Sequence, residues 1–124
     1  MILTHIKSLP VRRAYRAVAV TMSRTYPGLK TNLLSLVFAD DNTQIVVAHD
    51  GYQLAGAASY NRFEQGIHLY ALVSFVPGAG SALMELLEGY GYPEIRLVPQ
   101  PEAMDWWEKR GYTLEADGIM YQRR

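Results

Sequence analysis

The sequence has no cysteine among its 124 residues. This absence excludes disulfide bonds, thiolate metal ligands and a covalent acyl-cysteine intermediate. Long apolar runs are also missing. None approaches the roughly 18 residues that a membrane-spanning helix needs, and the opening stretch MILTHIKSLP lacks the layout of a signal peptide. We therefore expect a soluble, cytoplasmic protein that does not enter a membrane.

Acidic residues are absent from positions 1–39, although the whole chain carries 12 acidic and 12 basic residues. Two interpretations stay open for this basic segment: a surface that attracts an anion, or the solvated face of a helix. A sequence pI of about 6.8 argues against a dedicated nucleic-acid-binding protein. The basic residues of the segment are Lys7, Arg12, Arg13, Arg16, Arg24 and Lys30.

A chain of this length can bury one core, so we expect a single domain over residues 1–124. Its first part predicts a strand at 2–9, a helix from Pro10 and a second, short helix at 32–39. The first helix should turn Arg12, Arg13 and Arg16 outward. Its apolar residues at helical spacing, which should face inward, are Val11, Tyr15, Val18, Ala19 and Met22.

Strand-like patterns dominate the middle of the chain. Residues 43–49 and 52–60 predict two strands joined by a hairpin turn at Asp50-Gly51, and residues 61–66 predict a loop. Residues 67–75 predict a long strand with both faces partly covered. Uninterrupted alternation puts Ile67, Leu69, Ala71, Val73 and Phe75 on one face and His68, Tyr70, Leu72 and Ser74 on the other.

The rest of the chain alternates between helix and strand. A helix follows the glycine turn, a short strand covers 94–98, a helix runs from Pro101 to a glycine cap at Gly111, and a hairpin at 113–122 closes the chain. The order β-α-α-β-β-β-α-β-α-β-β predicts an α/β fold whose mixed, partly antiparallel central sheet is flanked by helices. The strands on either side of the glycine helix should form a parallel crossover. The closing hairpin is a candidate pairing edge for a homodimer.

The stretch FVPGAGSALMELLE, residues 75–88, combines a glycine turn with the start of an amphipathic helix. Free backbone N–H groups at such a helix start favour a bound anion, whereas a plain tight turn remains the alternative interpretation. The Walker pattern is absent, and the third glycine of the dinucleotide fingerprint would fall at Leu83. The histidines lack metal-ligand spacing, so we expect no metal.

Two motifs in the second half carry a resemblance to a known family. GAGSALMELLE is similar to a pyrophosphate-binding turn, and QPEAMDWWEKRGYTLE is similar to a late helix that usually reads Asn, Ala, Phe-Tyr-Glu-Lys, Gly-Phe. Over Ile67 to Glu115 the chain thus resembles the GNAT superfamily of acyl-CoA-dependent N-acetyltransferases. At the motif positions stand Gln100 for Asn, Ala103 for Ala, Trp106-Trp107 for Phe-Tyr and Gly111-Tyr112 for Gly-Phe.

The resemblance implies a GNAT-like acetyltransferase that moves an acetyl group from acetyl-CoA to an amine by direct attack in a ternary complex. It also implies that the central strand and the strand after the glycine helix splay apart around acetyl-CoA. Backbone N–H groups of Phe75 to Ser81 would hold the pyrophosphate, and backbone near Leu72 to Ser74 the pantetheine. The coenzyme-binding candidates are Leu72, Val73, Ser74, Phe75, Val76, Pro77, Gly78, Ala79, Gly80, Ser81, Gln100 and Trp107.

The amine would enter beside the N-terminal helices and the loop at 61–66. Glu64 and His68 are then candidate general bases, and Tyr70 and Tyr112 candidate acids for the leaving thiolate.

Two positions depart from the family pattern: Phe75 stands where Gln or Arg is usual, and Trp107 where a proton-donating tyrosine is frequent. They keep open an alternative, a GNAT-fold module that binds acyl-CoA or a protein without catalysis. The basic N-terminal segment keeps open a nucleic-acid-associated function.

Overall fold

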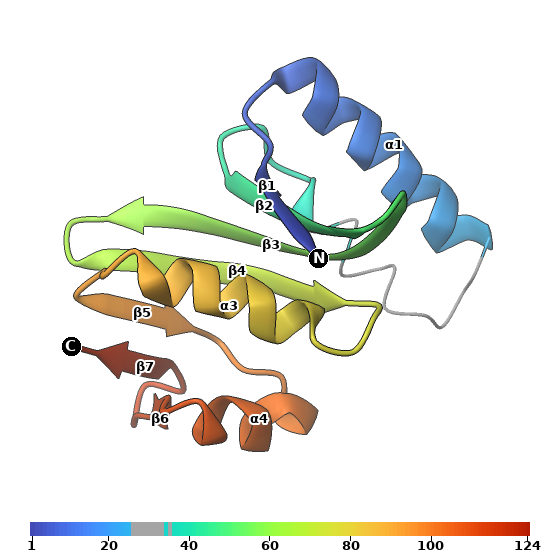
Figure 1. The fold of residues 1–124 in the computed structure, drawn as a ribbon. Coiled ribbons are helices and arrows are strands. Elements are labelled where there is room, and N and C mark those ends of the chain that lie inside the picture. Colours follow the sequence, from blue (N-terminus) through green and yellow to red (C-terminus); the bar gives the residue numbers. More distant parts are fainter. Residues whose placement is uncertain (26–33, 35) are drawn as a thin grey trace.

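The computed structural model describes residues 1–25, 34 and 36–124. Its strands form one sheet in the order β1-β2-β3-β4-β5-β7-β6 (Figure 1). The strands are β1 (Ile2–His5), β2 (Gln44–Asp50), β3 (Gln53–Phe63), β4 (Gly66–Ser74), β5 (Glu94–Leu97), β6 (Thr113–Leu114) and β7 (Met120–Arg123). The helices are α1 (Leu9–Thr25), α3 (Ala79–Gly89) and α4 (Met104–Lys109), with a 3-10 turn, η1 (Pro101–Ala103), before α4. The predicted mixed α/β fold is confirmed.

The sheet is antiparallel except where β4 pairs with β5. Helix α3 connects these two strands, as the predicted parallel crossover requires. Pairing between them covers Gly66↔Glu94 to Leu69↔Leu97 only, because β5 ends at Leu97 while β4 continues to Ser74. The second half of β4 therefore keeps β3 as a neighbour and has no strand on its other side.

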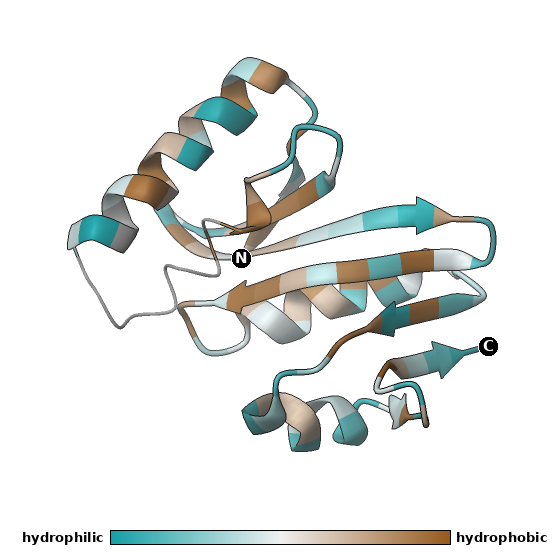
Figure 2. Cartoon of the chain, turned by 180° about the vertical axis from the view of Figure 1, so that it is seen from behind, coloured by the Kyte–Doolittle hydropathy of each residue, from teal (hydrophilic) through white to brown (hydrophobic). Residues whose placement is uncertain are grey.

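Two apolar layers pack on the two faces of the sheet. One layer contains Leu83, Met84 and Leu87 of α3 together with Trp107. The other contains Ala19 of α1. Seen from behind, the strands β3, β4 and β5 lie in front of α3, and α1 lies toward β1 and β2 (Figure 2). The first half of β4 and its neighbour β5 thus have one face covered by α3 and no described helix over the other.

A β-bulge interrupts β4 at Tyr70. Ser59 of β3 pairs with Ala71, but the next residue, Tyr60, pairs with Leu69, so Tyr70 is an extra residue on β4. The predicted uninterrupted alternation was therefore wrong. Side chains change faces at the bulge: Ile67 and Leu69 pack in the α3 layer, whereas the later residues of the same predicted face, Ala71, Val73 and Phe75, pack in the α1 layer.

The predicted loop at 61–66 was also wrong. Strand β3 continues through Phe63, and only Glu64 and Gln65 form the turn before β4. At the other end of β3, the hairpin after Asp50 is confirmed, with Gly51 at a φ of 63°. The first strand is shorter than predicted, since it ends at His5 and the helix begins at Leu9.

Helix α1 presents only part of the predicted face to the core: Ala19 is buried and Tyr15 packs against the core as predicted, but two of the predicted valines do not face inward. Arg12 is only 6% exposed, whereas Val11 is 44% and Val18 50% exposed. The guanidinium of Arg12 donates to the backbone carbonyl oxygens of Asp40, Asp41 and Thr43, which lie in the segment before β2. Three carbonyl acceptors compensate the burial of this charge, so the arginine rather than the valines faces inward.

Arg16 and Arg13 contact the same segment. Arg16 donates to the backbone oxygen of Phe38 and pairs with the carboxylate of Asp41, and Arg13 lies 3.7 Å from that carboxylate. The prediction that Arg12, Arg13 and Arg16 all turn outward was therefore wrong, because Arg12 is buried and Arg16 is half-buried in these contacts. Much of the basic N-terminal charge thus stabilises the fold.

The predicted second helix at 32–39 falls partly outside the described residues. Leu34, Leu36 and Val37 have helical backbone, and residues 32, 33 and 35 are not described. In the part of the chain that is described, no helix is long and apolar enough to cross a membrane.

Candidate functional site

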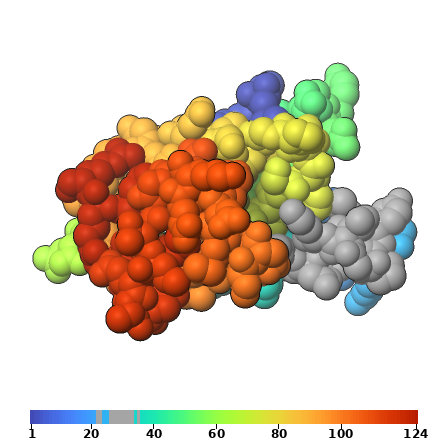
Figure 3. All heavy atoms as spheres, turned by 90° about the horizontal axis from the view of Figure 1, so that it is seen from below, coloured from blue at the N-terminus to red at the C-terminus, as the bar shows by residue number. Residues whose placement is uncertain are grey.

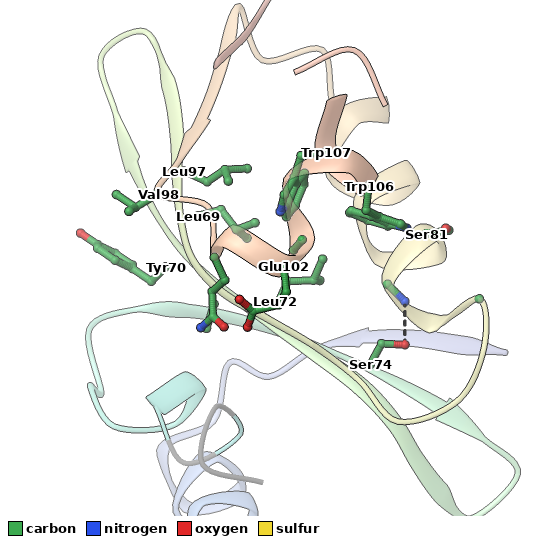
Figure 4. A pocket seen from close by; sticks show the side chains of 15 residues that line it. Leu69, Tyr70, Leu72, Ser74, Ser81, Leu97, Val98, Glu102, Trp106 and Trp107 are labelled. Atoms are coloured by element: carbon green, nitrogen blue, oxygen red, sulfur yellow. Dashed lines mark hydrogen bonds between the residues drawn. The ribbon is translucent and has the colours of Figure 1, made fainter. Parts of the chain in front are cut away.

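A cavity of about 420 Å³ opens where β4 and β5 separate. In the space-filling view, the orange segment that follows β5 lies next to the yellow segment that leads into α3 (Figure 3). Side chains from β4, the start of α3 and the η1–α4 segment surround the cavity (Figure 4). Its lining residues are Leu69, Tyr70, Ala71, Leu72, Ser74, Gly78, Gly80, Ser81, Leu97, Val98, Gln100, Glu102, Ala103, Trp106 and Trp107.

The backbone of the open part of β4 faces this cavity in alternation. The N–H of Phe75 donates to Ala55 of β3 over 2.8 Å, so the N–H and C=O of Val73 also point to β3. The backbone groups of Leu72 and Ser74 therefore point to the unpaired edge. Of the predicted strand residues, Leu72 and Ser74 line the cavity, whereas Val73 is buried on the α1 side of the sheet.

The glycine turn begins α3 with Gly78, whose φ of 89° is a left-handed conformation that favours glycine. Ala79 donates its N–H to Val76, and Ser74 Oγ donates to the oxygen of Val76 over 2.9 Å. Gly80 N–H lies 3.4 Å from Ser74 Oγ, a long contact at the cavity wall. A helix start of this kind leaves N–H donors for an anion.

Not every N–H of the predicted loop is available. Phe75 donates to β3, Ala79 donates within the turn, and Pro77 has no N–H. The prediction that the loop holds an anion with all N–H groups from Phe75 to Ser81 was therefore too broad. Gly80 N–H donates to Ser74 Oγ over 3.4 Å, so the N–H groups of Val76, Gly78 and Ser81 remain, and the last two of these residues line the cavity.

Phe75 points away from the cavity, to the other face of the sheet. Its side chain packs with the α1 layer and lines a second cavity beside Tyr15 and Leu54. The Tyr15 hydroxyl and His49 Nε2 form a 2.6 Å hydrogen bond beside this second cavity. Phe75 stands where the family pattern usually has Gln or Arg. An apolar side chain suits this position because it lies in an apolar layer.

Two tryptophans from α4 form the wall opposite β4 (Figure 4). Trp107 is 5% exposed and stands edge-on to Trp106, with ring centroids 4.7 Å apart, and to Tyr112 at 5.0 Å. Trp106 lies near the start of α3, 3.8 Å from where a Cβ of Gly80 would be. The guanidinium of Arg110 lies 5.1 Å from the centre of the Trp106 ring on the same helix. Trp107, predicted from the motif, and Trp106, which was not, both line the cavity.

The two candidate acids do not meet in the cavity. Tyr112 is 2% exposed and donates its hydroxyl to Glu88 over 3.0 Å, while Arg110 pairs with the same carboxylate at 2.6 Å. Burial, followed by the charge of Glu88 and this hydrogen bond, raises the pKa of Tyr112. Tyr70 lies at the cavity edge with its hydroxyl directed away from Trp107 (Figure 4). That hydroxyl accepts a hydrogen bond from Asn61 over 3.2 Å.

The two candidate bases are also separated. His68 packs against Tyr70, with ring centroids 4.9 Å apart, and its Nδ1 accepts from Arg96 Nε over 3.1 Å. Burial, followed by the charge of Arg96, lowers the pKa of His68. Glu64 is exposed in the β3–β4 turn, six residues or roughly 20 Å of strand away from Tyr70. Neither Glu64 nor His68 lines the cavity.

Several lining residues escaped the sequence reasoning. Glu102 is not among the predicted coenzyme-binding residues, yet it lines the cavity (Figure 4). Gln100, two residues earlier, was predicted and does line it. Gln100 caps η1 and Glu102 lies within it, so the short separation of Glu102 from the predicted Gln100 was the available signal. Across the described residues, no group of three or more His, Asp or Glu side chains is arranged to hold a metal ion.

Comparison with known proteins identifies the fold. No protein-family model matches the sequence, and no curated protein matches it significantly. Similar solved structures include Tetrahymena GCN5, with a TM-score of 0.68 at 12% identity over 99% of this chain and 96% of that one. The PaiA N-acetyltransferase of Thermoplasma acidophilum in complex with coenzyme A gives 0.59 at 16% identity over 100% of both chains.

An aminoglycoside 6'-N-acetyltransferase complexed with coenzyme A gives a TM-score of 0.65 at 16% identity, covering 99% of this chain and 97% of that chain. Each of the three likenesses extends over nearly the whole length of both proteins. The expected resemblance is therefore confirmed at the level of architecture, and the chain has the fold of the GCN5-related N-acetyltransferases, the GNAT fold.

Proposed function

We propose that residues 1–124 act as one domain that transfers an acetyl group from acetyl-CoA to an amine. The observation that carries this proposal is the cavity at the split between β4 and β5, with a helix N-terminus at one end and two tryptophans along its wall. Such a cavity suits a long ligand with an anionic part and an apolar arm. The coenzyme A complexes of the similar aminoglycoside and PaiA enzymes support it.

Binding of acetyl-CoA would rely on backbone groups more than on charged side chains. The N–H groups of Gly78 and Ser81 are the donors for the pyrophosphate, and the open-edge backbone of Leu72 and Ser74 would hold the pantetheine and thioester. Fixed backbone N–H groups also stabilise an oxygen anion that develops during acyl transfer. No cationic side chain of the described residues lines the cavity, so affinity should depend weakly on salt.

The amine would approach β4 from the face opposite α3, where Tyr70 and His68 lie. His68 is poorly placed as a general base because Arg96 occupies its Nδ1. Glu102 is the one carboxylate that lines the cavity within the described part of the chain, and we assign it, through water, as the proton acceptor. Glu102→Gln should then lower kcat and leave the affinity for acetyl-CoA unchanged.

Protonation of the leaving thiolate is assigned to water. Tyr112 is held by Glu88, and the hydroxyl of Tyr70 faces Asn61. The indole N–H of Trp107 can donate a hydrogen bond to sulfur but cannot transfer a proton near neutral pH. This arrangement lowers the rate of transfer, and it favours the alternative function, a GNAT-fold module that binds acyl-CoA without turnover.

Calorimetry with acetyl-CoA, followed by a screen of amines for CoA release, tests the proposal. We expect binding together with CoA release on at least one class of amine. The absence of heat at millimolar acetyl-CoA would overturn both the transferase and the binding module. Tight binding with no CoA release on any amine would replace the transferase by the binding module.

A further inference from the structure

A row of polar side chains crosses the sheet beside the cavity. Asn61 of β3 pairs with His68 of β4, His68 pairs with Arg96 of β5, and Arg96 pairs with Tyr121 of β7. Residues directly opposite one another on paired strands point to the same face. This is the face opposite α3, over which no described helix lies at β4 and β5 (Figure 2). The row is therefore reachable from the side on which an amine would approach.

Arg96 is fixed in this row without a carboxylate partner. Its Nε donates to His68, and its guanidinium lies 4.1 Å from the centre of the Phe63 ring. Its two terminal nitrogens make no hydrogen bond or ion pair with any described residue. All 12 acidic residues of the chain fall in the described range 40–124, so the undescribed positions add no acid.

The neighbours of Arg96 also present hydrogen-bond donors. Because Nδ1 of His68 accepts from Arg96, the neutral ring carries its proton on Nε2. Burial, followed by the charge of Arg96, lowers the pKa of this ring, which favours its neutral form. The hydroxyl of Tyr70 accepts from Asn61, which leaves its own hydrogen free to donate. The cluster of Arg96, His68 and Tyr70 thus carries one positive charge and hydrogen-bond donors that no described residue accepts.

The cluster adjoins the cavity through Tyr70, which belongs to both. We propose that Arg96, with His68 and Tyr70, binds a carboxylate of the acceptor, so that the acceptor is an amine that also carries a carboxylate group. This inference rests on the proposed acetyl transfer. The two residue steps from His68 to Tyr70 cover about 7 Å of strand, a distance that one small amino acid or a short amino-carboxylic acid can span.

The chemistry of the cluster distinguishes among classes of amine. A guanidinium presents two parallel N–H groups that match a planar carboxylate, and a site with one charge is neutralised by one carboxylate. An aminoglycoside or a polyamine would instead place several cations against an unpaired arginine, which is unfavourable. The acceptor class should therefore differ from the aminoglycosides named for one of the similar structures.

The test measures transfer to pairs of acceptors. The panel contains the 20 common α-amino acids, β-alanine and 4-aminobutyrate, each beside its carboxamide, with spermidine and kanamycin as polycationic amines. CoA release at fixed acetyl-CoA gives kcat/KM for each. We expect at least one carboxylate acceptor to exceed its carboxamide by tenfold or more. Arg96→Gln should bring that ratio near one by raising KM, and Arg96→Lys should restore part of it.

Arg62→Gln is the matched control, because Arg62 is an exposed arginine on the other face of β3, over the Tyr92 ring at 5.5 Å. It should leave the ratio unchanged. The carboxylate assignment is overturned if carboxamides or polycations react as well as the acids, if no acid of the panel reacts although acetyl-CoA binds, or if Arg96→Gln keeps the ratio. Calorimetry on each variant separates these results from the failure of acetyl-CoA binding, which would remove the proposed function itself.

Discussion

The two halves of β4 have opposite roles although they belong to one strand. The paired half, Gly66–Leu69, has β3 on one side and β5 on the other, whereas the open half, Tyr70–Ser74, has only β3. The paired half contributes Ile67 and Leu69 to the core, and the open half directs backbone groups to the cavity. The bulge at Tyr70 separates them. A binding site arises here because one strand continues after its neighbour has ended.

The largest effect is expected where the paired half is most crowded. A Cβ on Gly66 would lie 1.7 Å from the carbonyl oxygen of Glu94, in the backbone of β5. Gly66→Ala should therefore force β4 and β5 apart and lower the free energy of unfolding by about 4 kcal/mol or more. Urea denaturation followed by circular dichroism measures the loss.

Gly89→Ala, at the end of α3, is the matched control, since a Cβ there meets nothing within 4 Å. It should be neutral or raise the free energy of unfolding by about 0.5–1 kcal/mol. An unfolding midpoint of Gly66→Ala equal to that of Gly89→Ala would show that the two strands are not in close register.

The cavity beside the open half should tolerate changes that abolish binding. Ser81 is half-buried in the first turn of α3 and lines the cavity. Ser81→Glu places a negative charge at a helix start, which stabilises the helix slightly but repels a pyrophosphate. We expect acetyl-CoA affinity to fall about a hundredfold, or about 2.7 kcal/mol, while the unfolding midpoint is kept.

Ser81→Gln separates charge from size in this measurement and should lose less than tenfold in calorimetry. Equal losses for Ser81→Glu and Ser81→Gln would indicate a steric effect, and unchanged affinity in both would place the anion elsewhere.

The sequence was most informative about the cavity beside the open half. Gly78 and Gly80 predicted the turn, and the family resemblance implied a role for Gln100 and Trp107; all four residues line the cavity. These features are local, because a positive φ or a helix start is determined by a few neighbouring residues. The order of helices and strands along the chain also followed from local patterns.

The bulge at Tyr70 was not predictable in the same way. It depends on the pairing of Ser59 and Tyr60 with β4, and period-two alternation contains no sign of it. The inward face of α1 was missed for a similar reason: the acceptors of Arg12 lie 28 to 31 residues along the chain, in the backbone of another segment. Apolar residues occur on several sides of α1 itself, so their spacing alone does not show which face packs against the core.

Trp107→Tyr places a proton donor at the cavity wall opposite the open half of β4. A tyrosine hydroxyl there should protonate the departing thiolate in place of water, and we expect kcat to rise about tenfold, or about 1.4 kcal/mol. Loss of the larger ring should lower stability, since Trp107 is 5% exposed. Steady-state kinetics at saturating acetyl-CoA measures the change.

Trp106→Tyr, on the same wall, is the comparison variant and should not raise kcat. If folded Trp107→Tyr binds acetyl-CoA normally and its kcat stays the same, protonation of the thiolate does not limit the rate.

The smallest expected effect is the change of the free energy of unfolding with pH. It depends on His68, which lies in the paired half of β4. Burial, followed by the charge of Arg96, lowers the pKa of His68 from 6.5, and burial followed by Lys7 lowers that of His5. Around pH 6.5 and below, the unfolded chain thus binds more protons than the folded one, and the free energy of unfolding falls as pH decreases. Urea midpoints should drop between pH 7.5 and pH 5.5. The drop should be smaller in His68→Gln and smaller again with His5→Gln added. A midpoint that rises on acidification over this interval would mean that the folded state favours charged histidines, which the unpaired Arg96 beside His68 opposes.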